Sequence, residues 1–188
     1  MSAQQAAQAA LAAGFTPQQA VIAVAISGAE TGGWTQFLGD YGLHGGAGGP
    51  YWPCGGQSGP CSIGYWQINQ CAHQPTLAGM AGTSDPCAIQ TWLLNPSNCA
   101  RAAYVVSNHG TDWTPWTTYN DGRYRAYLQE ASAAVKAASG GGGGSQSSPG
   151  SPAFIPIPQA LPSWVLPAGL MIIAVALLGA GIEEEERR

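Results

Sequence analysis

Charged residues are scarce in this chain of 188 residues, in which Lys, Arg, Asp and Glu together make up 9%, against about 25% in an ordinary soluble domain. The six basic residues are outnumbered by ten acidic ones, and the net charge is -4. This balance excludes a protein that binds nucleic acid through a basic surface, because such a surface needs clustered Lys and Arg. Residues 137–182 contain no charge, so we do not expect an entirely soluble protein. The length leaves room for one domain with a core and a membrane appendage.

The sequence also lacks the patterns of a metal centre and of a serine hydrolase. A zinc site from Cys54, Cys61, Cys71 and His73 would not have the usual spacing of two to four residues between ligands. The histidines stand alone, and no Ser-His-Asp order is present. We therefore predict neither a metal nor a cofactor.

A hydrophobic run near the C-terminus predicts a transmembrane helix. Residues 164–182 are 19 uncharged positions, and a helix of that length spans roughly 28 Å, close to the hydrocarbon core of a bilayer. The length disfavours the alternative, a buried core helix. Six charged residues, 183–188, follow as a tail. Arg187 and Arg188 favour a C-terminus on the cytoplasmic or lumenal side, with the rest of the chain on the other face.

Residues 140–163 predict a linker between that helix and a soluble domain over residues 1–139. Five consecutive glycines begin the linker and prolines follow, so its first half should be flexible and its second half more extended. Such a linker suits a domain that searches a fixed substrate near a membrane, and equally a passive spacer. The first residues lack the basic and apolar regions of a secretory signal. We therefore expect a tail-anchored protein, a virion membrane protein or export by another route.

Helix start and stop signals predict two helices at the start of the domain. Residues 3–13 are rich in Ala and Gln and end at Gly14, which is typical of a helix C-terminus. Thr16 and Gln19 form a capping box. The apolar helix that follows should be buried and should reach Glu30.

The rest of the domain predicts further helices around a long irregular segment. Candidate helices lie at about 86–94, 96–108 and 122–138, each after a turn signal. Residues 39–82 are rich in Gly, Pro and Cys, which is typical of an excursion that lines a site. Within it, residues 63–68 alternate and predict a short strand or an irregular loop.

Glu30 is the first candidate for a catalytic residue. The domain contains one other glutamate, Glu130, in a polar stretch of the last predicted helix, where a solvated face is expected. Glu30 instead ends a nearly all-apolar helix, so its carboxyl should be partly desolvated and its pKa raised toward neutrality. Such an acid can protonate a glycosidic oxygen. From these residues alone, a hydrogen-bonded structural glutamate is an equal alternative.

Aromatic residues add weight to a carbohydrate substrate. Six of the seven tryptophans and all seven tyrosines lie before residue 128. Their flat apolar faces and polar edges suit sugar rings as well as cores. Core packing is the default expectation for any single ring.

Four segments resemble, in the same order, motifs of the soluble lytic transglycosylases and goose-type lysozymes, in the form found in phage and actinobacterial members. They are Ala23–Trp34, which is similar to the helix that delivers the catalytic Glu, then 62–69 (SIGYWQIN), 95–104 (NPSNCARAAY) and 112–122, the closing motif. The resemblance covers about residues 20–128 and implies a mainly α, lysozyme-like α+β domain. Cys99 departs from the family, which has Ala there, and 45–61 is an insertion without a counterpart.

The resemblance implies a reaction in which Glu30 protonates the oxygen between N-acetylmuramic acid and N-acetylglucosamine. Glu30 then takes the proton of the muramyl 6-hydroxyl, and a 1,6-anhydro product forms without water. One carboxyl suffices, in contrast with the usual pair. Asp40, ten residues after Glu30, keeps a hydrolytic lysozyme as the alternative.

The same resemblance implies the residues that surround the substrate. Gln67 and Asn69 would shape the site around Glu30. Further substrate contacts would come from Thr31, Tyr104 and Tyr119. The implied partners are peptidoglycan glycan strands, the lipid bilayer through residues 164–182, and virion proteins if a phage carries the chain.

Three classes of function remain open at this point. The favoured class is a membrane-tethered enzyme that cleaves peptidoglycan, and the presence of Glu30, Gln67 and Asn69 together supports it. The second is a wall-binding module, and the third a structural protein of an envelope or virion. A phage that carries a membrane and must pierce the host wall suits these features, as does a bacterial envelope with the domain facing the wall.

The five cysteines allow at most two disulfides within one chain. One free cysteine and two bridges can be arranged in 15 ways. We predict Cys54–Cys61, which would close the Gly-rich insertion, and Cys87–Cys99, which would join two adjacent helices, although connectivity is not readable from sequence. An oxidising, wall-facing compartment favours disulfides over thiols.

Overall fold

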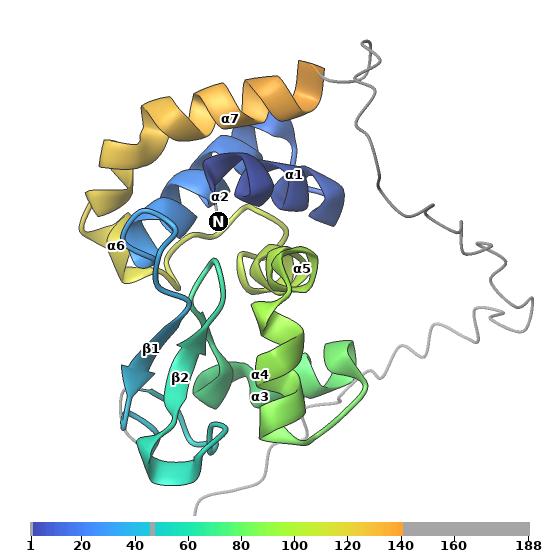
Figure 1. The fold of residues 1–188 in the computed structure, drawn as a ribbon, viewed down its shortest axis with the longest axis vertical. Helices are drawn as coiled ribbons and strands as arrows, with labels where there is room; N and C mark the ends of the chain where they lie inside the picture. The colour runs from blue at the N-terminus through green and yellow to red at the C-terminus, as the bar shows by residue number, and fades with distance from the viewer. Residues whose placement is uncertain (1, 46–47, 141–188) are drawn as a thin grey trace, which may run out of the picture. The chain divides into compact units, whose positions relative to one another are not determined.

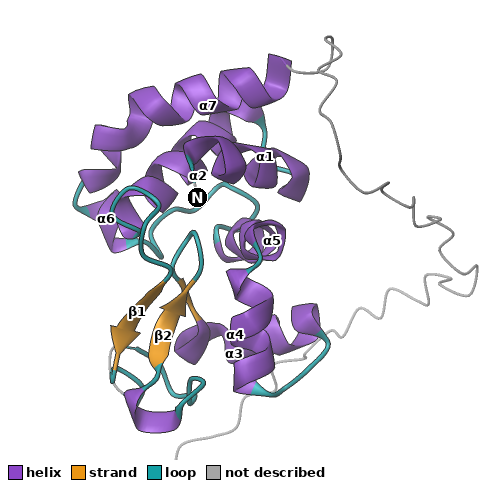
Figure 2. Ribbon diagram, in the orientation of Figure 1, coloured by secondary structure: helices purple, strands orange, loops and turns teal. Residues whose placement is uncertain are grey.

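The structure is a computed structural model that describes residues 2–45 and 48–140 (Figure 1). These residues are mainly helical with one small sheet (Figure 2), as predicted for the domain. The elements in chain order are α1 (Ala3–Ala13), α2 (Pro17–Glu30), β1 (Leu38–Tyr41), the 3₁₀ turn η1 (Gly56–Ser58), β2 (Pro60–Ile63), β3 (Ile68–Asn69), α3 (Gln70–Ala81), α4 (Pro86–Leu94), α5 (Pro96–Val106), α6 (Thr117–Asn120), the 3₁₀ helix η2 (Arg123–Tyr127) and α7 (Leu128–Gly140).

The first two helices have the bounds that their capping signals predict. Ser2 and Gln5 form a capping box at the start of α1, and Gly14 ends that helix in the left-handed conformation, which glycine adopts without strain. Thr16 and Gln19 form the capping box of α2. Seven residues of α2 are buried, so α2 is the central helix of the domain, and it ends at Glu30.

The predicted irregular segment forms a small sheet followed by a helix. The strands are ordered β1-β2-β3 and are antiparallel, with Leu38 paired to Ile63 and Ser62 to Asn69. Residues 64–67 form a turn between β2 and β3, so of the two alternatives expected for 63–68, a short strand or an irregular loop, the loop is the closer description. The helix α3 was not predicted, because Pro75 lies inside it and proline disfavours a helix interior.

Two of the three later helices begin at the predicted residues, and the third begins later than predicted. Asp85 and Asn95 cap α4 and α5 through their side chains, each ahead of a proline at the first helical position, where a missing N–H costs little. The single helix predicted at 122–138 is wrong in its first turn, since η2 occupies 123–127 and α7 begins at Leu128.

The elements fall into two groups, as Figure 1 shows. The helical half consists of α1, α2, α5, α6, η2 and α7, and the sheet half of residues 38–94, with β1 to β3, α3 and α4. Two buried indoles join the halves. Trp66 Nε1 donates a hydrogen bond to the Ala23 carbonyl of α2 at 2.8 Å, and Trp116 Nε1 donates to the Trp66 carbonyl at 2.7 Å. Both bonds are buried, so they fix the β2–β3 turn against α2.

The disulfide predictions were wrong. The bridges are Cys54–Cys87 and Cys61–Cys71, and Cys99 is a buried free thiol. Cys61 lies on β2, next to the start of α3, with 5.2 Å between the two Cα atoms of its bridge. Cys99 points from α5 into the core, where its Sγ lies 3.8 Å from the Ile63 carbonyl oxygen. Cys54 therefore pairs with a cysteine 33 residues away and not with Cys61, which is nearer in sequence.

No helix within residues 2–45 and 48–140 is both long enough and apolar enough to cross a bilayer. The predicted transmembrane helix at 164–182, the tail at 183–188 and nearly all of the linker at 140–163 lie outside the described residues.

Candidate active site

A cavity of about 330 Å³ lies where the end of α2 meets the sheet and the residues around α6. It brings together Glu30, Gln67 and Asn69, three of the predicted site residues, from three different elements. Its lining is Glu30, Asp40, Leu43, Ser62, Gln67, Asn69, Pro115, Trp116 and Thr117.

One residue of α6 holds the side chain of Glu30, which is the last residue of α2. Thr118 Oγ1 donates a hydrogen bond to Glu30 Oε1 at 2.6 Å, and the Thr118 backbone N–H donates to the same oxygen at 3.4 Å. Thr118 is 2% exposed, so its hydroxyl is fixed in place. The second oxygen, Oε2, accepts no hydrogen bond within the described residues and is left for a ligand in the cavity.

The pKa of Glu30 is raised above the ordinary glutamate value. Desolvation by burial is the largest cause, and the nearby negative charge of Asp40 adds to it. The two hydrogen bonds from Thr118 and the positive charge of Arg123 act in the opposite direction. Because desolvation dominates, the protonated carboxyl persists to a higher pH than in an exposed glutamate, as a general acid requires.

Gln67 is the last residue of the turn between β2 and β3, and this turn aims it at the cavity. Its φ of 45° lies in the left-handed region, which is strained for a residue with a side chain. Gln67 Nε2 donates to the Gly64 carbonyl at 3.0 Å. A Cβ at Gly39 would lie 2.4 Å from Gln67 Oε1, so only glycine on β1 leaves space for this amide.

Asn69 serves the fold as well as the cavity. It is the N-cap of α3, and its Oδ1 accepts a hydrogen bond from the Ala72 N–H at 3.0 Å. Its Nδ2 group has no hydrogen-bond partner in the described part of the chain. The hydrogen bond to Oδ1 therefore orients the Asn69 amide, and its Nδ2 group can donate a hydrogen bond to a ligand in the cavity.

Asp40 is the second carboxylate of the cavity. It lies on the edge strand β1 with a φ of 55° and accepts a hydrogen bond from the Ser62 hydroxyl of the neighbouring strand. Asp40 is exposed whereas Glu30 is partly buried. Two carboxylates in environments of different polarity are a common arrangement for acid and base roles.

Thr31, Tyr104 and Tyr119 do not line the cavity. Thr31 is fully buried, and its hydroxyl donates to the Ser27 carbonyl at 2.7 Å and accepts from the Trp34 N–H at 2.9 Å. It therefore positions the end of α2 and presents no surface to a ligand.

The two tyrosines pack against other aromatic rings. Tyr104 lies edge-on to Phe15, with 4.9 Å between ring centroids, and contacts the end of α1. Tyr119 stacks on Tyr124, with 4.9 Å between ring centroids. Substrate contact by either residue stays a prediction.

Thr118 is the site residue that the sequence reasoning missed. It lies inside the segment 112–122 that resembles the closing motif of the family, and that position was its only signal. Nothing local marks it, because its role depends on a contact with Glu30, 88 residues earlier.

Most of the tryptophans belong to the core. Trp34, Trp66, Trp113 and Trp116 are at most 6% exposed. Trp34 and Tyr127 close over the last turn of α2, where a Cβ at Gly28 would lie 2.6 Å from Tyr127 and 2.8 Å from Trp34. This close approach desolvates the helix end that carries Glu30.

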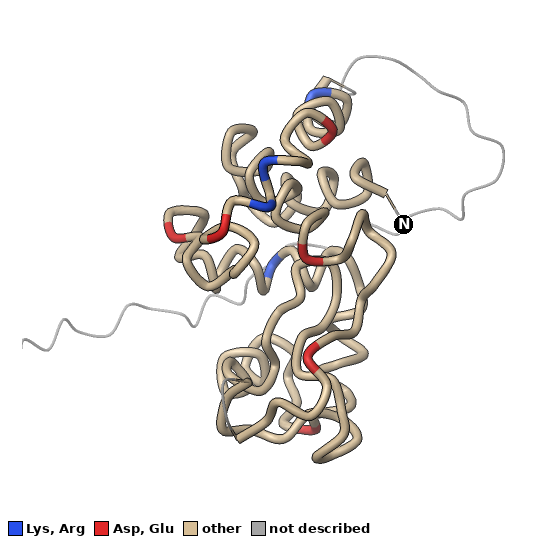
Figure 3. The backbone as a smooth tube through the Cα atoms, turned by 90° about the vertical axis from the view of Figure 1, so that its left-hand side faces the viewer, with Lys and Arg blue, Asp and Glu red and all other residues tan. Residues whose placement is uncertain are grey.

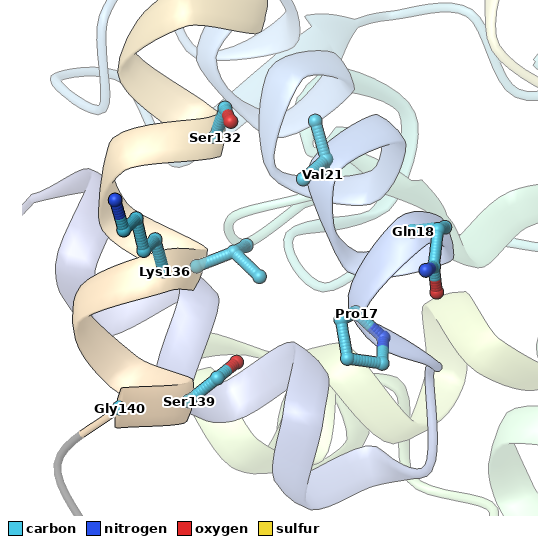
Figure 4. A pocket seen from close by; sticks show the side chains of 8 residues that line it. Pro17, Gln18, Val21, Ser132, Lys136, Ser139 and Gly140 are labelled. Carbon is cyan, nitrogen blue, oxygen red and sulfur yellow. The ribbon is translucent and has the colours of Figure 1, made fainter.

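A larger cavity of about 480 Å³ lies between α2 and α7 (Figure 4). Its walls are mainly the apolar parts of Pro17, Val21 and Val135, and Lys136 is its only charged residue. Its lining includes the hydroxyl groups of Ser132 and Ser139 but no carboxyl group and no histidine, so we assign no reaction to it. No group of three or more His, Cys, Asp and Glu residues within residues 2–45 and 48–140 could hold a metal ion.

Comparison with known proteins identifies the family. A family model described as a lysozyme-like domain matches residues 7–118, which includes Glu30, Gln67, Asn69 and Thr118. No curated protein and no solved structure matches the chain. The family match points to a glycosidase that cleaves peptidoglycan in general terms. Since the matched residues make up more than half of the sequence, the chain belongs to the family of lysozyme-like domains.

Proposed function

We propose that this protein is a peptidoglycan lytic transglycosylase with Glu30 as its catalytic residue. The observation that carries the proposal is the partly desolvated Glu30 carboxyl in a cavity, held through Oε1 by Thr118 with Oε2 free. The family match supports glycosidic cleavage of peptidoglycan in general. The transglycosylase reaction is the finer step that we add.

In the proposed mechanism, Glu30 carries its proton on Oε2, because Thr118 already donates to Oε1. This proton passes to the glycosidic oxygen as the bond between N-acetylmuramic acid and N-acetylglucosamine breaks. The resulting carboxylate then accepts the proton of the muramyl 6-hydroxyl, whose oxygen closes onto C1 to give the 1,6-anhydro ring. Gln67 and Asn69 orient the N-acetyl and hydroxyl groups with their amides, and no water is consumed.

Hydrolysis is the second candidate, and Asp40 favours it. This carboxylate lines the same cavity and raises the pKa of Glu30 through its charge. A second carboxylate can activate a water or stabilise positive charge on the sugar, as in enzymes that use a pair of acids. In that reaction the product gains one water and ends in a reducing sugar.

The test is the mass of the released fragments. The full chain, in mild detergent, is incubated with purified peptidoglycan, and the soluble muropeptides are analysed by mass spectrometry. Fragments that lack one water at the muramyl end support the transglycosylase, and reducing ends support the hydrolase. Release of no fragments, with the protein sedimenting on the wall material, would support the binding-module class instead.

Glutamate variants provide the matched control. Glu30→Gln should lower the rate by about 10²-fold or more, the usual contribution of a general acid. Glu130→Gln changes the other glutamate of the domain, which is exposed on α7, and should leave the rate unchanged. Equal activity of Glu30→Gln and the parent would overturn the mechanism.

We also propose that residues 164–182 tether the enzyme to a membrane, in a virion or in a cell envelope with the domain facing the wall. The support is the uncharged hydrophobic run of 19 residues, which is long enough for a bilayer. The full chain should sediment with membranes and resist extraction at alkaline pH, whereas a chain that ends at residue 163 should be extracted. Detection in purified virions distinguishes the two locations.

A further inference from the structure

Exposed apolar side chains are concentrated in one short part of the sheet half. Among the described residues, six large apolar or aromatic side chains are exposed, and five of them belong to β1 and the loop that follows it. The sixth is Val105 on α5. Such a concentration on a soluble domain marks a binding surface more often than a defect of packing. The five are Leu38, Tyr41, Leu43, Tyr51 and Trp52.

We call Tyr41, Leu43, Tyr51 and Trp52 the aromatic platform. Trp52 is 52% exposed although one face of its indole stacks on the His44 ring, with 3.5 Å between centroids and 27° between planes. A ring that is backed on one side and open to solvent on the other can accept a flat ligand. Tyr41, at 59%, is the most exposed of the group.

The loop that carries the platform is anchored at both ends. The Tyr51 N–H donates to the Cys71 carbonyl at 3.1 Å, and the Gly42 N–H to the Gly59 carbonyl at 3.4 Å. The disulfide Cys54–Cys87 ties the same loop to the first turn of α4. Anchoring lowers the entropy that the loop loses when a ligand binds.

The platform continues from the cavity that contains Glu30. Leu43 belongs to both, because it lines that cavity and is itself 44% exposed. Tyr41 follows Asp40, another lining residue, on the same strand. A chain-like ligand that leaves the cavity past Leu43 therefore leaves it at a residue of the platform.

The charge of the surrounding surface selects the kind of ligand. Residues 41–84 contain no Asp, Glu, Lys or Arg, and Figure 3 shows few coloured segments in the sheet half. Nucleic acids and charged peptides would find no counter-charge here. Trp and Tyr rings instead provide apolar faces with polar edges, which match the faces and hydroxyl groups of pyranose rings.

We propose that the aromatic platform binds uncharged N-acetylglucosamine units of the glycan strand beyond the cleavage site. This inference rests on the proposed function for the identity of the ligand. It assigns a role to the insertion at 45–61, which has no counterpart in the family motifs, and to exposed aromatics that the reaction itself does not use.

The experiment measures binding without turnover. The full chain carrying Glu30→Gln, in mild detergent, is titrated with long glycan strands freed of their stem peptides, and with the free disaccharide. Adding Trp52→Ala or Tyr41→Ala should raise the dissociation constant for long strands about two- to tenfold, the range for loss of one aromatic contact. Trp52→Phe should retain most of the affinity, and Val105→Ala, the matched exposed residue on α5, should change nothing. The disaccharide can occupy the cavity without the further sugar units that the platform is proposed to bind, so it should bind all variants alike.

Two outcomes separate this inference from the proposed function. In the first, the parent releases muropeptides, but adding Trp52→Ala or Tyr41→Ala to the Glu30→Gln chain does not weaken its binding of long strands. This outcome refutes the platform and leaves the proposed enzyme activity supported. If the parent releases none but both substitutions weaken binding, the catalytic proposal is refuted and the platform stands as a glycan-binding surface. Should Trp52→Ala fail to fold, as judged by thermal unfolding, Tyr41→Ala and Trp52→Phe carry the same comparison.

Discussion

In the helical half, α1 and α2 bury mostly alanines against their neighbours, whereas the sheet half is closed by two disulfides around a sheet of short strands. The halves differ in charge as well, because the sheet half contains only Asp40 and Asp85 (Figure 3). Small side chains let helices approach closely and bury surface along their whole length. In the sheet half only β2 is buried along its whole length, and Ile63, Trp66 and Leu77 are fully buried there. The two disulfides add covalent links to this core.

The comparison shows where catalytic precision comes from. Glu30 and Thr118 both belong to the helical half, and their contact is partly buried. Gln67, Asn69 and Asp40 approach from the sheet half, which the indole of Trp66 joins to α2 and which contains both bridges. Glu30 is therefore held within the helical half, and the other polar residues of the cavity belong to the half that contains both cross-links.

Removing a bridge should have the largest effect and should act on one half more than on the other. Cys54→Ser together with Cys87→Ser should lower the free energy of unfolding by about 4 kcal/mol, given the 33 residues between them, and the Cys61 and Cys71 pair by about 3 kcal/mol. Denaturant unfolding measures the loss. Hydrogen exchange should show lost protection in β1, β2 and α4, with α1 and α2 still protected.

A matched control for the bridges is Cys99→Ala, which removes a thiol that forms no disulfide. Cys99→Ala should leave the hydrogen-exchange protection of β1, β2 and α4 unchanged. Uniform loss of protection across both halves in the Cys54 and Cys87 variant would contradict the distinction drawn between them.

Thr118→Val should have an intermediate effect, confined to the contact that orients Glu30. The hydrogen bonds from Thr118 lower the pKa of Glu30, so removing the hydroxyl should raise that pKa further. The protonated form of Glu30 then persists to higher pH, and the alkaline limb of the pH–rate profile should shift to higher pH. We expect kcat/KM at its optimum to fall about tenfold, equivalent to about 1.4 kcal/mol of lost orientation.

Thr118→Ser restores the hydroxyl and should return both the profile and the rate toward those of the parent. A Thr118→Val enzyme with an unshifted alkaline limb would mean that Glu30 does not act as the acid in this geometry.

Thr16→Ala should have the smallest effect and should act on the helical half alone. The Thr16 hydroxyl accepts a hydrogen bond from the Gln19 N–H at 3.3 Å, and loss of such a cap costs about 1 kcal/mol. Thermal unfolding measures it. Because the cap is at the opposite end of α2 from Glu30, the rate of peptidoglycan cleavage at low temperature should be unaffected. A parallel loss of rate would show that the two ends of α2 are coupled.

The parts of the fold that could be predicted are those with local signals. The bounds of α1 follow from Gly14 and from alanine-rich composition, and α4 and α5 follow from a capping residue and a proline. The helix α3 was missed because Pro75 and its uncharged surroundings resemble a loop. The bridges were missed because a disulfide depends on distance in space, which the spacing of cysteines does not contain.

The residues predicted for the candidate site include some that line the cavity and some that do not. Glu30, Gln67 and Asn69 were predicted because each lies in a motif, and the fold brings them to one cavity. Thr31 carries the same kind of signal, yet its hydroxyl is used to end α2. Sequence motifs therefore mark residues that the family needs, without separating those that meet the substrate from those that hold the backbone.

The buried Cys99 has a consequence for how the chain acquires its bridges. Burial raises the pKa of its thiol to about 12, and thiol–disulfide exchange requires a thiolate. Once the core has formed around α5, the Cys99 thiol is unreactive in disulfide exchange, and the four remaining cysteines can pair without competition from it. Before that moment all five are equivalent nucleophiles. Correct pairing of the bridges is therefore favoured when the core around α5 forms before oxidation.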